Sequence, residues 1–238
     1  MPDHIAQGLV IFGLAFVPAL FGIICHEVAH GWVAYKMGDP TAKFLGRLTL
    51  NPIKHIDPMG LGVFAFTAIF SPFIIGWAKP VPVQPRYFRR PREGMMLVSV
   101  AGPMTNFLVA ALCALILKLC LNMIASGVEL TTPLLWICQS AFLGITINCA
   151  LAWFNLMPIP PLDGSHILEG LLPESLARGY AALARYGMLI ILLLVATGFF
   201  RYVLVPLITQ SMSFISAIFG VPGSLGQLIQ TLRALSGA

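Results

Sequence analysis

Charged side chains are scarce in this sequence, and acidic ones are the scarcest. Only 10% of its 238 residues are charged, with nine Asp and Glu against fourteen Lys and Arg, whereas 58% are hydrophobic. Soluble domains carry about a quarter charged residues, so this composition excludes a soluble globular protein. Mean hydropathy is +0.88, and several apolar runs reach the roughly 20 residues that cross a bilayer. The sequence therefore predicts an integral membrane protein.

The sequence also lacks any paired-cysteine motif. Its five cysteines lie in apolar segments, and none is spaced as C-x-x-C (Cys25, Cys113, Cys120, Cys138 and Cys149). This pattern excludes a disulfide framework, and we expect the cysteines to serve in packing. A cleavable leader is not expected either, because no basic segment precedes the first apolar run.

The basic residues gather in two short loops between apolar runs. Nine of the fourteen Lys and Arg lie in residues 36–59 and 79–92. Such clustering is typical of loops on the cytoplasmic side of a membrane. The net charge of +5 therefore indicates contact with a lipid bilayer rather than with nucleic acid.

The apolar runs predict an α-helical polytopic membrane protein, a bundle of about 5–6 membrane segments with a small membrane-associated β element. Four runs are long enough to cross, at residues 8–35, 93–121, 133–157 and 181–206. Residues 60–77 are shorter, and they either cross the membrane or re-enter it from one side. The β element is expected in the alternating residues 43–52.

We divide the chain into a membrane core at residues 1–206 and a C-terminal part at residues 207–238. The C-terminal part is expected to be a short final span or an interfacial amphipathic helix. If both basic loops are cytoplasmic, the first three long spans run inward, outward and inward. This path places the start of the second span and the end of the third at the same cytoplasmic-side depth as His26–His30.

The segment HEVAH at His26–His30 is the strongest chemical signal in the sequence. Residues four apart share one face of a helix, so His26 and His30 can present two imidazoles to one ion. In the H-E-x-x-H arrangement two His bind zinc, and the Glu, here Glu27, is a general base rather than a ligand. Ionisable residues in a membrane helix are energetically costly, which favours a functional zinc site over a chance match.

A catalytic zinc usually takes a third protein ligand and keeps one position open. Asp163 follows the Pro-rich end of a span, where the chain can turn a carboxylate inward. It could equally serve as a turn or N-cap residue for the helix that begins near Ser165. His55 and His166 are rival third ligands, and spacing alone leaves these alternatives open.

The segment AKPVPVQP at residues 78–85 is expected to be extended, because each Pro fixes φ and keeps the preceding residue out of a helix. An extended segment can bind an unwound peptide as an added strand, here through Val81 and Val83. The alternative is a stiff surface connector. Three amides inside spans, Asn106, Asn148 and Asn155, are candidates to line a water-filled cleft.

Taken together, the motifs resemble the site-2 protease family of intramembrane zinc metalloproteases. The matches are HEVAH at His26–His30, AGPMTN at Ala101–Asn106 and the N-x-x-P-x-x-P-L-D-G segment at Asn155–Gly164. The chain is similar to the compact bacterial members that lack a PDZ domain, and NPIKHIDPMG around His55 resembles a signature of that branch. The resemblance implies a multi-pass protein of the bacterial cell (inner or plasma) membrane, with its active site near the cytoplasmic side.

The resemblance also implies a role for each matching residue. His26, His30 and Asp163 would hold one Zn²⁺ per chain, and Glu27 would be the general base. In the family, the residues that match Asn155 and Pro161 are associated with substrate positioning. Further candidate substrate-binding residues are Asn106 of the expected cleft and Val81 and Val83 of the extended segment, and His55 is a possible auxiliary residue.

The implied function is hydrolysis of membrane-anchored protein substrates, as in regulated intramembrane proteolysis. The alternatives are a proteolytically silent relative that holds membrane clients and a small transporter with broken helices. A two-fold repeat within the sequence would favour the transporter, and we find none. The sequence indicates no oligomeric state.

Overall fold

The computed structural model describes residues 2–70 and 76–236, in which the regular secondary structure is helical. The α-helices are α1 (Pro2–Lys36), α2 (Thr41–Phe44), α3 (Pro58–Phe70), α4 (Pro91–Ala125), α5 (Thr132–Asn155), α6 (Asp163–Leu171), α7 (Glu174–Ala181), α8 (Gly187–Ala196), α9 (Phe199–Phe219) and α10 (Leu225–Ser236). Three short 3₁₀ turns lie between them, at Pro52–Lys54, Pro85–Tyr87 and Ala182–Tyr186.

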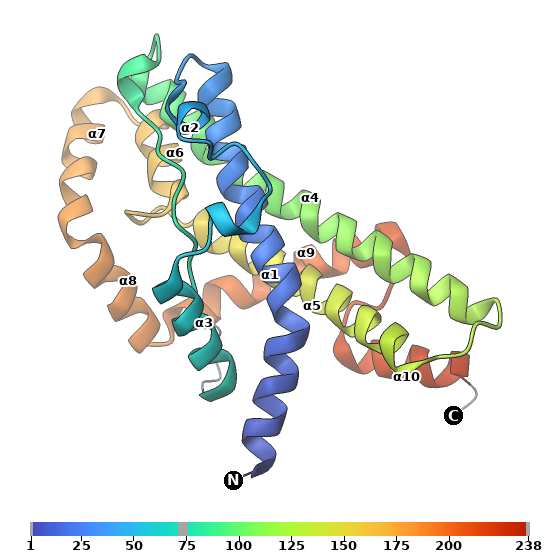
Figure 1. The fold of residues 1–238 in the computed structure, drawn as a ribbon. Helices are drawn as coiled ribbons and strands as arrows, with labels where there is room; N and C mark the ends of the chain where they lie inside the picture. The colour runs from blue at the N-terminus through green and yellow to red at the C-terminus, as the bar shows by residue number, and fades with distance from the viewer. Residues whose placement is uncertain (1, 71–75, 237–238) are drawn as a thin grey trace.

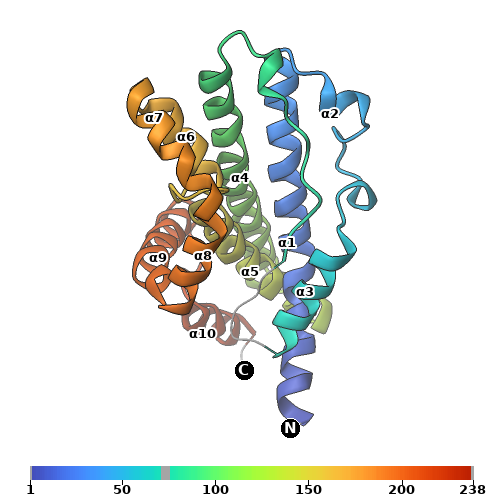
Figure 2. The same ribbon diagram turned by 90° about the vertical axis from the view of Figure 1, so that its left-hand side faces the viewer.

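The long helices α1, α4 and α5 pack side by side and form the centre of the molecule (Figures 1 and 2). Small residues let these helices approach closely, as is usual between membrane helices. A Cβ at Gly144 of α5 would lie 2.6 Å from Sγ of Cys113 on α4 and 3.0 Å from Cβ of Pro18 on α1. Apolar residues of α4 and α5 extend this core toward α9 and α10.

Five described helices are long and apolar enough to cross a membrane, which agrees with the expected polytopic helical class. The expected span at residues 181–206 is wrong in its bounds, because the chain breaks at Thr197–Gly198. Gly198 has φ +70°, a left-handed conformation that favours glycine. One candidate span therefore ends at Ala196, and the next is α9, which runs through position 206 to Phe219.

Helices α7 and α8 form an arc that stands away from the central helices, whereas α6 packs against α4 (Figure 1). Only 6% of the apolar window in Glu174–Ala196 is buried, compared with 39–44% for the three central spans. Met188, Leu189 and Leu192 of α8 are more than half exposed. Because this face is apolar, its natural surroundings are lipid tails or another membrane helix.

The two ends of the segment that contains α3 lie next to each other. Ile56 before α3 and Ala78 after it form an antiparallel bridge. The amide of Lys79 also donates to the carbonyl of His55 over 2.8 Å. At about 1.5 Å per residue, the 13 residues of α3 span about 20 Å, which is shorter than a bilayer core. This geometry fits the re-entrant alternative for residues 60–77, of which 71–75 lie outside the described residues.

The expected small β element is reduced to the bridge between Ile56 and Ala78 in the described part of the chain. Within residues 43–52, Lys43 and Phe44 belong instead to the short helix α2. The buried Arg47 donates from Nη2 to the carbonyls of Lys79 and Pro80. The alternating pattern therefore marks a loop, not a strand, and this loop packs against the extended connection at residues 79–85.

Candidate active site

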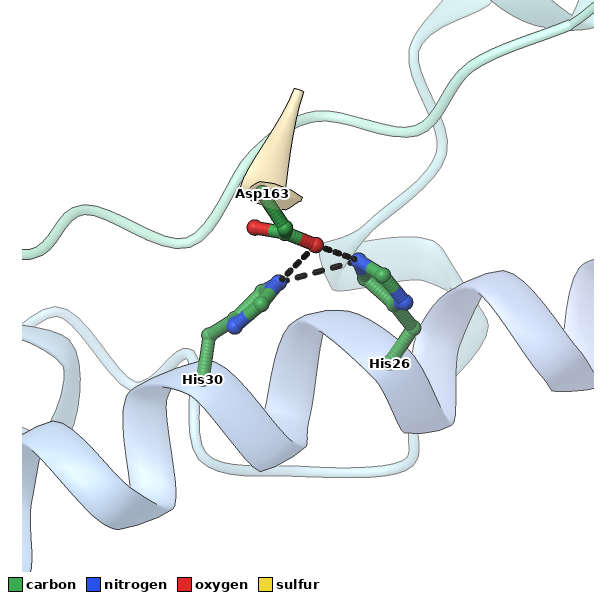
Figure 3. A group of neighbouring side chains, drawn as sticks. All are labelled: His26, His30 and Asp163. Atoms are coloured by element: carbon green, nitrogen blue, oxygen red, sulfur yellow. Dashed lines mark hydrogen bonds and ion pairs between the residues drawn. The ribbon is translucent and has the colours of Figure 1, made fainter. Parts of the chain in front are cut away.

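The two His of HEVAH lie on one face of α1 and point toward the same spot (Figure 3). Their Nε2 atoms are 2.9 Å apart, and the rings are nearly perpendicular, at 89°. Both side chains are buried, His26 with 7% and His30 with 9% of its surface exposed. The helical spacing of four residues is what brings the two imidazoles together.

Asp163 completes this group from the other side. It is the first residue of α6, and its Oδ2 lies 3.1 Å from Nε2 of His26 and 3.3 Å from Nε2 of His30. Gly164 fixes this start of the helix, since a Cβ there would overlap the carbonyl of Leu156. The N-cap residue of α6 is Leu162 and Asp163 lies inside the helix, so the N-cap alternative for Asp163 is not supported.

The outer nitrogens of the two imidazoles determine what the inner nitrogens can do. Nδ1 of His26 donates to Oδ1 of Asn106 over 2.6 Å, and Nδ1 of His30 donates to the carbonyl of Val98 over 2.8 Å. A neutral imidazole with its proton on Nδ1 has a lone pair on Nε2. Two such lone pairs and a carboxylate oxygen therefore face one another at about 3 Å.

This arrangement fits a metal cation. No described residue donates a hydrogen bond to the buried Oδ2 of Asp163. Three acceptors at such distances repel one another unless a positive charge lies between them. The three ligand atoms lie within 4.8 Å of one another, and two imidazoles with one carboxylate are a donor set that zinc accepts.

Gly102 of α4 provides the space for the two imidazoles. A Cβ at this position would lie 2.5 Å from Cε1 and Nε2 of His30 and 2.6 Å from Cε1 of His26. At this close contact between α4 and α1, only glycine fits. The segment AGPMTN contributes twice to the site, through this glycine and through Asn106.

Glu27 is held by the extended connection rather than by α4 or α6. Its Oε2 accepts a hydrogen bond of 2.7 Å from the amide of Val81. The connection runs along α1 (Figure 2), and its amides at Lys79 and Gln84 are bound to His55 and Asp39. The position after His26 on the helix thus turns the carboxylate toward the connection, beside the His pair.

The remaining predicted residues lie at varied places. His55 is fully buried, and its Nε2 donates to the carbonyl of Thr49. His166 pairs with Glu169 over 3.6 Å. Neither belongs to the group of possible metal ligands found among the described residues. Asn155 donates to the carbonyl of Leu151 in its own helix. Pro161 is exposed on the turn before α6.

Two of the three amides do not line a cleft. Asn106 and Asn148 have no exposed surface. They lie where α1, α4 and α5 pack together, and each forms hydrogen bonds to a neighbouring helix there. Sequence reasoning also missed the role of Gly102 at the imidazoles and of Arg47 at the connection. The motif AGPMTN does not by itself reveal which residues its glycine faces.

Comparisons with known proteins point to the same chemistry. The sequence model of peptidase family M50 matches residues 14–195, which contain His26, His30 and Asp163. The chain is 41% identical to "Putative zinc metalloprotease YwhC" of Bacillus subtilis, over 82% of this chain and 85% of that protein. It is 30% identical to "Putative zinc metalloprotease Rip2" of Mycolicibacterium smegmatis, over 79% of this chain and 68% of that protein.

No solved structure matches the chain. The family model nevertheless spans most of the chain, and the relatives align with it over most of their own length. The chain therefore belongs to peptidase family M50, the site-2 proteases, and is a multi-pass membrane protein of zinc metalloprotease type.

Proposed function

We propose that this protein is an intramembrane endopeptidase that hydrolyses peptide bonds of membrane-anchored proteins, with His26, His30 and Asp163 as its zinc ligands. The single observation that carries the proposal is the convergence of three acceptors: Oδ2 of Asp163 lies 3.1 and 3.3 Å from two imidazole nitrogens. When bound there, zinc supplies a Lewis acid that makes water a nucleophile near neutral pH and polarises the scissile carbonyl.

In this proposal Glu27 is the general base. Its Oε2 is held by the amide of Val81, and its Oε1 remains to take a proton from the attacking water and later to deliver it to the leaving amine. A carboxylate fixed at one oxygen has little freedom to turn away from the water. His26 and His30 are held in place in the same way, by hydrogen bonds at Nδ1.

The substrate must be extended before its backbone can be attacked, because a helix hides its carbonyls in hydrogen bonds. We propose that the connection at residues 79–85 holds the unwound peptide. Val81 uses its amide on Glu27, and Pro80 and Pro82 have none. Val83, whose amide has no partner among the described residues, is thus the available donor.

Asn155 and Pro161 are the further substrate contacts in this proposal. Asn155 ends α5 and Pro161 lies on the turn that leads from α5 to Asp163, so a peptide bound near the metal would pass them. Asn155 uses one amide hydrogen on Leu151, which leaves its oxygen and its second hydrogen for a ligand. Asn106 is assigned instead to the support of His26, because it has no exposed surface.

The active site is proposed to lie near the cytoplasmic face of a bacterial inner or plasma membrane. His30 is six residues before the end of α1, which corresponds to about 9 Å along the helix axis. The end of α1 at Lys36 begins the first basic loop, and basic loops favour the cytoplasmic side.

The proposal is tested by zinc content and cleavage together. Purified protein in detergent or nanodiscs should hold about one zinc per chain and cleave members of a panel of single-span membrane proteins. We expect Glu27→Gln to keep the zinc and abolish cleavage, and Asp163→Ala to lose both. Retained zinc and full cleavage in Asp163→Ala would show that the third ligand lies elsewhere.

The alternative is a proteolytically silent member of the family that binds membrane clients. The same panel separates the two functions, because a silent relative would bind clients without cutting them, and Glu27→Gln would change nothing. The hydrogen bond that fixes Glu27 beside the His pair favours the protease, since a client-binding protein has no need of it.

A further inference from the structure

A chain of buried amides connects three helices to one of the candidate zinc ligands. Asn148 on α5 accepts a hydrogen bond of 3.0 Å at its Oδ1 from Nδ2 of Asn106 on α4. Oδ1 of Asn106 in turn accepts from Nδ1 of His26 on α1, over 2.6 Å. Both asparagines are fully buried, so water cannot substitute for any member of this chain.

The direction of this chain is fixed at its far end. Nδ2 of Asn148 lies 2.9 Å from the carbonyl of Gly144 and 3.4 Å from that of Pro18. Carbonyls only accept hydrogen bonds, so the NH₂ group of Asn148 must face them and its oxygen must face Asn106. Asn106 then turns its own oxygen to His26, and only an Nδ1–H of His26 can complete the series.

The space for this chain is built into the helix contacts. A Cβ at Gly22 of α1 would overlap Oδ1 of Asn148, and the carbonyl of Gly22 accepts a second hydrogen bond from Nδ2 of Asn106. Neither amide can therefore turn without losing partners on α1. The second His differs, because the partner of His30 is the backbone carbonyl of Val98, which does not depend on a side chain.

We propose that Asn148 is a positioning residue for the zinc site, which acts on His26 through Asn106. It contacts neither metal nor substrate. Its role is to hold the proton of His26 on Nδ1, so that the lone pair of Nε2 faces His30 and Asp163. This inference rests on the zinc site proposed above and extends it by one residue beyond the partners of the ligands.

The competing explanation is that Asn148 only joins helices. An interhelical hydrogen bond in a membrane protein contributes little to stability on average, so a purely structural role predicts a small loss of stability and no effect on the metal. The chain offers a matched control in Ser140, whose hydroxyl donates to the carbonyl of Leu14 over 2.8 Å. This bond joins α5 to α1, as the bond from Asn148 to Pro18 does, about two turns of α5 away from Asn148.

The test compares zinc affinity in three variants of the full-length protein, measured by competition with a chelator. Asn148→Leu removes the hydrogen bonds to Asn106, Gly144 and Pro18, so that only the carbonyl of Gly22 still holds the NH₂ group of Asn106. We expect zinc affinity to fall about tenfold, the lower end of the effect of losing a direct partner of a metal ligand. Asn148→Asp in its protonated form can still donate and accept, and it should recover most of the affinity. Ser140→Ala should bind zinc as the wild type does.

A second measurement includes a test on the wild type alone, which does not depend on how well any variant folds. With ¹⁵N-labelled histidine, the metal-free wild type should show His26 with its proton on Nδ1, and Asn148→Leu should shift the population toward Nε2–H. Wild-type affinity in Asn148→Leu, an equal loss in Ser140→Ala, or a wild-type His26 protonated on Nε2 would each overturn the proposal. If the wild type itself binds no zinc, the proposed metal site is wrong. If the wild type binds zinc but Asn148→Leu binds it equally well, only the role of Asn148 is wrong.

Discussion

The amide of Val81 donates to Oε2 of Glu27 over 2.7 Å, and this bond ties the candidate general base to the extended connection. Val81→Pro removes the donor and keeps the extended backbone, since Pro adopts such a conformation. A hydrogen bond to a charged group contributes about 1.5–3 kcal/mol, so we expect kcat to fall about ten- to a hundredfold while zinc content is unchanged. Steady-state kinetics on one cleaved substrate measure the change.

Val83→Pro is the control on the same connection. The amide of Val83 has no partner in the part of the chain that the structure describes, so this substitution leaves Glu27 in place. We expect it to raise KM and preserve kcat, because it removes a donor to the bound peptide. Equal kcat values for Val81→Pro and the wild type would contradict the assigned role of Val81, and unchanged kinetics in Val83→Pro would contradict the substrate edge.

Gly102→Ala should damage the metal site directly. The new Cβ would lie 2.5 Å from His30, and both imidazoles are held at Nδ1, so they cannot move aside without losing a hydrogen bond. Overpacking of this kind typically costs about 1–3 kcal/mol. We expect at least a tenfold loss of zinc affinity, measured against a chelator.

The matched control for Gly102→Ala is Gly179→Ala in α7, where a Cβ meets no described atom within 4 Å. This variant should bind zinc normally. If Gly102→Ala also did so, α4 would have to be further from α1 than the structure places it, and the compact arrangement of the three ligands would be in doubt.

The site was predictable from the sequence only where its residues are close in the chain. The spacing of His26 and His30 alone predicts two imidazoles on one helix face, because the helical period is fixed. The choice of Asp163 needed a family resemblance, since a carboxylate 133 residues beyond His30 has no local signal that separates a ligand from a turn residue. The family resemblance identified Asp163 as a candidate ligand, and in the structure its carboxylate lies beside the two imidazoles.

Other features could not be predicted because they depend on which helices meet. Asn148 and Asn106 were expected to line a cleft, yet they face each other across the contact between α4 and α5. The span at residues 181–206 is apolar over most of its length, so hydropathy does not reveal that the backbone turns at Thr197–Gly198, between α8 and α9. Apolar composition indicates burial in lipid, but not where the backbone turns.

Asp39 makes the attachment of the connection to α1 dependent on pH. Burial alone would raise the pKa of the Asp39 carboxyl, but hydrogen bonds from Thr41 and from the amide of Gln84, with the charge of Arg86, outweigh it and hold the pKa below the ordinary 3.8. A group whose pKa is lowered by folding stabilises the protein above its unfolded pKa. This stabilisation is lost as the pH falls below 3.8 through the lower folded value.

Asp39→Asn separates this effect from other acid titrations. The wild type should have a higher Tm than the variant at pH 5 and above, and the difference should close as the pH drops below 3.8, where the wild-type carboxyl also becomes neutral. Thermal unfolding followed by circular dichroism measures both proteins across this range. A difference in Tm that grows in acid would have the wrong sign for a carboxylate that accepts hydrogen bonds.

The bridge between Ile56 and Ala78 predicts that the two basic loops lie on one side of the membrane. Lys54 and Lys79 flank this bridge and are exposed, whereas the exposed Glu129 lies at the far end of α4, a span of 35 residues. A membrane-impermeant maleimide should therefore label Lys54→Cys and Lys79→Cys only from the cytoplasmic face and Glu129→Cys only from the other, with the unsubstituted chain as the background. Labelling of Lys54→Cys and Lys79→Cys from opposite faces would require the α3 segment to cross the bilayer. Since 13 helical residues span about 20 Å and the two ends of the segment are hydrogen-bonded to each other, such a crossing would break the bridge that holds the connection against Glu27.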